Sequence, residues 1–134
     1  MRKSFLIVAV AASLLSGCSG WSKWWGAPLD PARPQVSFID GKISVKPEPL
    51  RFAKDQTQVT IVWSVPKGAG VTFADNGIVV DKARDEIVEC RPRNEGLEFS
   101  CLNRHTVPGT YKYTIRLLQG GKPLEPHDPT IMND

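Results

Sequence analysis

The fold is constrained most by short segments in which apolar and polar residues alternate along the chain. The clearest covers residues 110–118, where one face carries Tyr111, Tyr113, Ile115 and Leu117. Residues 57–65 alternate in the same way, with Val62 as the exception. A period of two is typical of strands that bury one face, and no long segment after the first residues has the spacing of an amphipathic helix. The sequence therefore predicts an all-β domain.

Turn signals divide the chain into further short strands. Asp40 and Gly41 predict a two-residue hairpin, because glycine adopts positive φ without strain. Residues 75–77 (Asp-Asn-Gly) predict a turn between two more strands. The proline-rich tail, residues 123–134, is expected to supply at most a short edge strand. About seven to nine short strands without intervening helices predict an antiparallel β-sandwich of immunoglobulin-like or cupredoxin-like type.

The first residues have the composition of an export signal. Arg2 and Lys3 precede an apolar stretch, residues 5–15, that is too short to span a bilayer as a helix. We expect this segment to be removed from the mature protein. The predicted organisation is a signal peptide over residues 1–17, a lipidated tether over residues 18–34 and a β-sandwich domain over residues 35–134.

Residues 15–18 (Leu-Ser-Gly-Cys) resemble the lipobox of bacterial lipoproteins. The resemblance implies cleavage before Cys18, a diacylglyceryl group on its thiol and an acyl chain on the new amino terminus. Several chains hold a protein on a membrane far more firmly than one chain does. Ser19 stands where enteric bacteria use aspartate to retain such proteins in the inner membrane, so we expect the outer membrane, facing the periplasm. An ordinary signal peptide with a chance cysteine, or an uncleaved anchor, are the alternatives.

Cleavage changes the charge balance of the chain. The full sequence has 17 Lys and Arg against 14 Asp and Glu, a net charge of +3. Arg2 and Lys3 leave with the signal, so the mature chain has 15 basic and 14 acidic residues. A nearly neutral domain gives no support for nucleic-acid binding.

Three tryptophans follow the lipidation site closely. Trp21, Trp24 and Trp25 lie in the tether, within a few residues of the expected acyl chains. Indole rings partition into the headgroup layer, so we expect these side chains at the membrane interface. Two alternatives stay open: one or more rings pack on the domain, or they form a docking motif for a partner.

The other two cysteines are expected to form a disulfide. Cys90 and Cys101 lie in a predicted hairpin with its bend at residues 94–97, which places them opposite each other, with Val88 and Phe99 on the same face. Disulfides persist outside the cytosol, where the export signal sends the chain. A bond that closes so short a loop contributes roughly 3 kcal/mol in the chain-entropy model.

Residues 109–113 (Gly-Thr-Tyr-Lys-Tyr) resemble the strand of cupredoxins that precedes the copper-binding cysteine. In that family a cysteine follows the second aromatic residue by two positions, with histidines before and after it. Here that position is Ile115, and no histidine precedes His105. A blue-copper centre needs two imidazoles and a thiolate, so the resemblance implies at most the scaffold without copper.

A second metal hypothesis groups Cys90, Cys101, His105 and His127, which are residue types that zinc or Cu(I) accepts. The cysteine spacing matches no zinc-finger pattern, so a disulfide is favoured and His105 is expected in a solvated loop. No motif of a hydrolase, metalloprotease or phosphate-binding enzyme occurs. The charged connection, residues 81–86, has the composition of a solvated loop.

The sequence therefore predicts a non-catalytic lipoprotein whose β-sandwich serves as a binding or assembly module for an envelope protein, with no cofactor. The alternative is a periplasmic carrier of copper or zinc. Loops on sandwiches often carry function, which makes residues 66–70 and 103–109 candidate contact surfaces.

Overall fold

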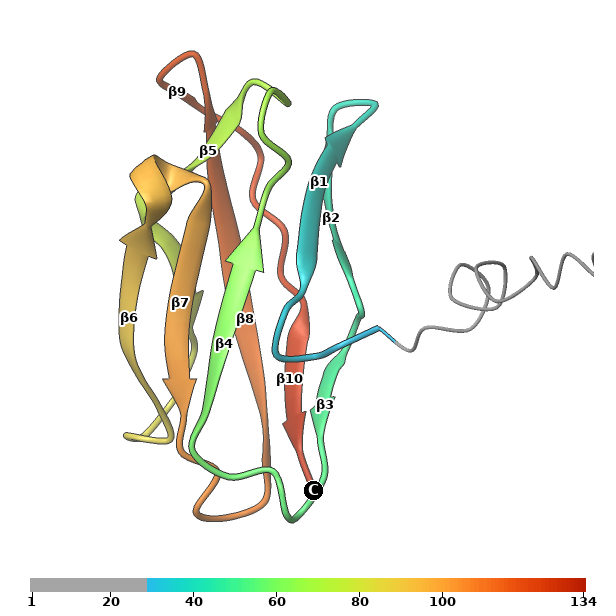
Figure 1. Ribbon diagram of the computed structural model, residues 1–134, viewed down its shortest axis with the longest axis vertical. Helices are drawn as coiled ribbons and strands as arrows, with labels where there is room; N and C mark the ends of the chain where they lie inside the picture. Colours follow the sequence, from blue (N-terminus) through green and yellow to red (C-terminus); the bar gives the residue numbers. More distant parts are fainter. Residues whose placement is uncertain (1–28) are drawn as a thin grey trace, which may run out of the picture.

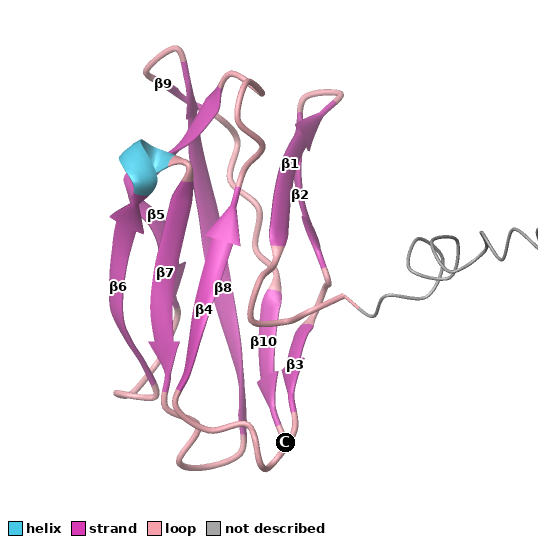
Figure 2. Cartoon of the chain, in the orientation of Figure 1, coloured by secondary structure: helices cyan, strands magenta, loops and turns pink. Residues whose placement is uncertain are grey.

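The computed structural model describes residues 29–134 as two β-sheets packed face to face. The strand order in the first sheet is β2 (Lys42–Lys46), β1 (Gln35–Ile39), β4 (Val59–Ser64), β7 (Glu98–Asn103) and β6 (Ile87–Arg93). The order in the second is β3 (Leu50–Phe52), β10 (Thr130–Asn133), β8 (Gly109–Gln119) and β5 (Val71–Val80), with β9 (Lys122–Pro123) paired to β8. Figures 1 and 2 show both layers, with the short 3-10 turn η1 (Asn94–Gly96) between β6 and β7.

This architecture confirms the predicted all-β sandwich. The described residues form ten strands, compared with the seven to nine predicted. Both sheets are mixed, because β1 lies parallel to β4 and β3 lies parallel to β10. No helix within residues 29–134 has the length and apolar character needed to cross a membrane.

The core lies where the predicted apolar faces of β4 and β8 meet. Trp63 of β4 and Tyr113 of β8 are completely buried, with ring centroids 5.4 Å apart. The indole Nε1–H of Trp63 donates to the Tyr113 hydroxyl over 3.3 Å, so each aromatic side chain satisfies the polar group of the other. Burial is the main reason why the pKa of Tyr113 is raised.

The predicted hairpin at residues 40–41 is confirmed. Asp40 and Gly41 have φ of 54° and 76°, the left-handed values that a two-residue hairpin requires. On one face of this hairpin the hydroxyls of Ser37 and Ser44 are hydrogen-bonded at 2.7 Å. The chain joins the first sheet before β1 begins, because Val62 N–H donates to Ala32 O over 2.9 Å.

The turn predicted at residues 75–77 is wrong. These residues lie inside β5, and both halves of that strand pair with β8 across a bulge between Phe73 and Ile78. Gly77 is required there because a Cβ atom would lie 2.8 Å from Phe73 Cβ and 2.9 Å from Ala74 O. The Asp-Asn-Gly signal therefore marks a bulge, in which glycine permits close packing.

The prediction for the tail is also wrong, because β10 is an internal strand. It lies between β8 and β3, where Ile131 pairs with Tyr111 on one side and with Leu50 on the other. Prolines precede β10 and do not interrupt it, and the carbonyl of Pro129 accepts a hydrogen bond from Tyr113 N–H over 3.0 Å. No pattern in the sequence indicated β3, although its Leu50 is fully buried.

Strands β6 and β7 are linked by the expected disulfide between Cys90 and Cys101. The bend at residues 94–97 is confirmed, since Leu97 N–H donates to Asn94 O over 3.0 Å. The predicted position of Val88 is wrong. A bulge after Val88 places two residues of β6, Glu89 and Cys90, opposite the single residue Cys101 of β7, so Val88 pairs with Leu102 and does not share the buried face of Cys101.

Candidate functional site

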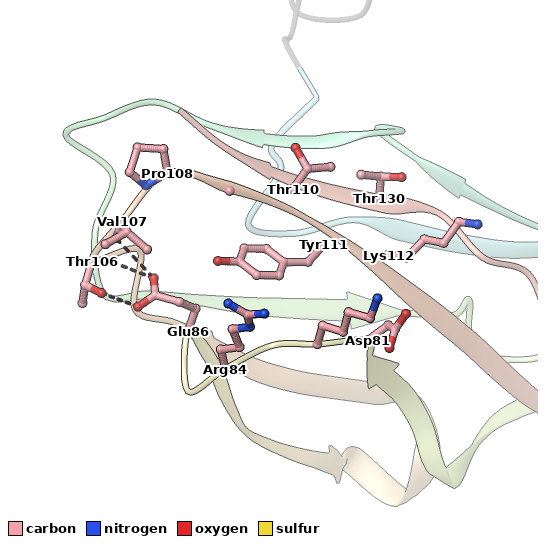
Figure 3. Close-up of a pocket in the computed structure, with 12 residues that line it drawn as sticks. Asp81, Arg84, Glu86, Thr106, Val107, Pro108, Thr110, Tyr111, Lys112 and Thr130 are labelled. Carbon is pink, nitrogen blue, oxygen red and sulfur yellow. Dashed lines mark hydrogen bonds between the residues drawn. The ribbon is translucent and has the colours of Figure 1, made fainter.

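A groove of about 820 Å³ lies where β5 separates from β8. The last main-chain contact between the two segments is the hydrogen bond from Asp81 N–H to Lys112 O, 2.8 Å long. Beyond it, residues 81–86 cross to the first sheet while β8 continues back to Gly109. We call the space between residues 81–86 and 106–112 the β8 groove; Figure 3 shows the side chains around it.

Glu86 fixes the shape of the groove at one end. It is buried, and its carboxylate accepts hydrogen bonds from Thr106 N–H at 2.7 Å, from the Thr106 hydroxyl and from Val107 N–H at 3.5 Å (Figure 3). These bonds, led by the one from the Thr106 hydroxyl, lower the pKa of Glu86 although burial opposes them. The expectation that this connection is fully solvated is therefore wrong at its last residue.

Three cationic side chains and two carboxylates, those of Asp81 and Glu86, line the groove. In residues 29–134, none of Lys82, Arg84 and Lys112 has a carboxylate within ion-pair distance. Lys82 and Arg84 also have left-handed backbone conformations, with φ of 51° and 45°, which are uncommon outside glycine. Such conformations cluster where a loop has a functional shape. With three cations against two carboxylates, the lining of the groove has a small excess of positive charge.

Tyr111 provides an aromatic surface inside the groove. Its ring extends from β8 toward Glu86 and Arg84 (Figure 3). The pKa of Tyr111 is raised, mainly because its side chain is partly buried. The negative charge of Glu86 also raises this pKa, whereas the positive charge of Arg84 lowers it. Gly109 leaves room for the hydroxyl, since a Cβ atom there would lie 2.7 Å from it. The phenol is therefore held neutral beside the cationic rim.

His105 is buried, so the prediction of a solvated loop residue is wrong. Its Nδ1 lies 2.8 Å from the main-chain oxygen of Gln56, and its Nε2 lies 2.8 Å from the main-chain oxygen of Asp134. The ring thus connects the segment after β3 to the end of β10. Both nitrogens are occupied by protein oxygens, which leaves neither free to ligate a metal ion.

The residues of the second metal hypothesis are not brought together. Cys90 and Cys101 are bonded to each other, and His127 Nε2 lies 3.2 Å from Glu48 Oε1 on another part of the surface. Within residues 29–134, no group of three or more His, Cys, Asp and Glu side chains is arranged to hold a metal ion.

The remaining predicted site residues, Cys18, Trp21, Trp24 and Trp25, lie outside the described residues. Of the two loops predicted as contact surfaces, residues 103–109 form part of the groove wall, and residues 66–70 form an exposed turn after β4. The sequence did not identify Glu86 or Tyr111 as groove residues, because their proximity depends on where β5 separates from β8. The local signals were the run of charged residues at 81–86 and the loop at residues 103–109.

No protein-family model matches the chain, and a search of curated proteins finds no match to its sequence.

Proposed function

We propose that this chain is an exported lipoprotein, anchored through Cys18 to the outer membrane and facing the periplasm, whose β-sandwich is a non-catalytic binding module. The lipobox-like run at residues 15–18 supports the anchor. The β8 groove supports the binding role, and envelope proteins are the proposed partners.

One observation carries the binding role: an aromatic ring and three cationic side chains, none of which forms an ion pair within residues 29–134, line an open groove. Charged groups that have no partner within the domain remain available to a ligand, and complementary charge accelerates association and selects partners. Lys82, Arg84 and Lys112 satisfy this condition within residues 29–134. Tyr111 adds apolar contact area of the kind found at protein interfaces.

The buried titratable groups near the groove have structural partners, which supports a non-catalytic role. Glu86 accepts hydrogen bonds from Thr106 and Val107, and both ring nitrogens of His105 face main-chain oxygens. A general acid or base needs a free position toward its substrate. The metal-carrier alternative loses support, because the disulfide occupies both of the thiols it requires.

The binding role can be tested in intact cells with a photo-crosslinking amino acid at Thr130, which lines the groove. The matched control places it at Thr60, an exposed threonine of β4. We expect a discrete adduct of higher mass from Thr130 and none from Thr60. Equal adducts from both positions, or none from Thr130, would overturn the assignment of the groove.

The anchor is tested separately with Cys18→Ala. We expect the variant to lose labelling by a fatty-acid probe and to remain unprocessed before residue 18. Labelling that persists in this variant would refute the lipidation site.

A further inference from the structure

The β8 groove exposes one edge of a strand. β8 pairs with β5 only from Tyr113 to Gln119, whereas β10 pairs with it from Gly109 to Lys112 on the opposite side. Residues 109–112 therefore have a strand partner on one side only. Their other edge, where β5 would lie if it continued past Asp81, faces the groove.

The hydrogen-bond pattern identifies Thr110 as the residue that faces this open edge. Tyr113 N–H points to the β10 side, where it donates to Pro129 O, while Lys112 O points to the β5 side and accepts from Asp81 N–H. Main-chain groups alternate in direction along a strand, so the N–H and C=O of Thr110 point to the same side as those of Lys112. Among residues 29–134, no main-chain hydrogen bond links Thr110 to residues 81–86.

We propose that this edge binds an extended acidic peptide segment of an envelope protein, which adds as a strand beside β8. The proposal rests on the proposed binding function of the groove and specifies its ligand. Thr110 would donate one hydrogen bond to the peptide and accept one from it, as in other complexes formed by strand addition. Lys82, Arg84 and Lys112 select carboxylate side chains, and Tyr111 offers a surface for an apolar one.

The free edge of β8 at residues 109–112 is protected against non-specific pairing with strands of other molecules. It is short, it begins just after Pro108, and the bound segment must pass between β8 and residues 81–86. Proline, charged residues and short length are the devices by which sheet edges avoid aggregation. A single extended segment fits this site, whereas a second sheet would collide with the connection.

The test uses the full lipidated chain in detergent micelles, with empty micelles as the blank. The probe is a short fluorescent peptide with blocked ends in which glutamate alternates with threonine. We expect anisotropy to report binding of this peptide, about tenfold weaker binding when its main-chain nitrogens are methylated, and no binding when lysine replaces glutamate. The Thr110 amide should exchange more slowly in the complex.

Two variants separate hydrogen bonding from charge. Thr110→Pro removes the N–H that faces the groove and no charge, so we expect about tenfold weaker binding. Lys112→Glu should weaken binding at least as much, whereas Lys122→Glu, on the exposed strand β9, should not. If Thr110→Pro does not fold, the methylated peptide makes the same distinction.

The methylated peptide binding as tightly as the unmethylated one would overturn strand addition and leave a simple anion site. An adduct from Thr130 in cells, together with no binding of the acidic peptide, would reject the ligand class and keep the groove. Failure of both experiments would reject the ligand and the proposed function together.

Discussion

The side-chain amides of Asn103 and Asn133 donate hydrogen bonds to each other, Nδ2 to Oδ1, at 2.8 and 2.9 Å. Asn103 belongs to β7 in the first sheet and Asn133 to β10 in the second, and both are buried. The pair is therefore a polar link between the two layers of the sandwich. Its bonds are satisfied only as long as both partners are present.

Asn103→Ala should lower the free energy of unfolding by about 1–3 kcal/mol, because it leaves the Asn133 amide buried without its partner. Chemical denaturation gives the value, and Asn76→Ala, on the exposed part of the β5 bulge, is the control. The Asn103→Ala, Asn133→Ala double variant should lose less unfolding free energy than the two single variants lose together. Strict additivity would contradict the link.

Thr106→Val should destabilise the domain by about 1 kcal/mol at neutral pH, because Glu86 loses a hydroxyl donor. The bonds lower the pKa of Glu86, so their contribution is present above the ordinary carboxyl pKa and disappears as pH falls through the folded-state value. The difference in unfolding free energy between wild type and variant should therefore shrink in acid. Thr110→Val, which removes no side-chain bond within residues 29–134, is the control; a pH-independent difference would contradict the role of Glu86.

Neither tyrosine of the chain should ionise at the ordinary phenol pKa of about 10. The sequence contains only Tyr111 and Tyr113, and burial raises the pKa of both. Their contribution to stability is present below the ordinary value and is lost as pH rises above it. A spectrophotometric titration should show tyrosinate absorbance delayed to higher pH, with Tyr113 ionising last. A normal titration of both residues in the folded protein would contradict this environment.

Reduction of the Cys90–Cys101 disulfide should lower the unfolding free energy by roughly 3 kcal/mol, as expected for a loop of this length. Denaturation with and without reductant measures the change. The Cys90→Ala, Cys101→Ala variant should be insensitive to the reductant. An intact mass that does not rise by two hydrogens on reduction would show that the bond is absent.

The sequence correctly predicts the strands that bury one whole face. It does not predict strand pairing that depends on segments far apart in the chain. The alternation in β4 and β8 identified the residues that meet as Trp63 and Tyr113 in the core. Residues 75–77 gave a local turn signal that pairing with β8 overrides, producing a bulge. The internal position of β10 depends on β3, which is too short to have a recognisable period.

The candidate site was predictable only in part, because it too depends on how distant segments are arranged. Alternation identifies the strand that contains Thr110, but its free edge exists because β5 turns away at Asp81, a feature of tertiary structure. His105 shows a second limit: nothing around it in the sequence indicates that the oxygens of Gln56 and Asp134 enclose its ring.

The parallel attachment of the entering chain to β4 has a mechanical consequence. In the proposed arrangement, with lipid at Cys18 and a partner at the groove, tension between the two would enter the sandwich through Ala32, whose carbonyl accepts a hydrogen bond from Val62 N–H. The neighbouring bond, from Ser64 N–H to Pro34 O over 3.2 Å, carries load in the same direction. A pull along the strand axis loads both bonds in shear, so they must break together. In that proposed arrangement, the two bonds would resist unfolding of the domain when membrane and partner move apart.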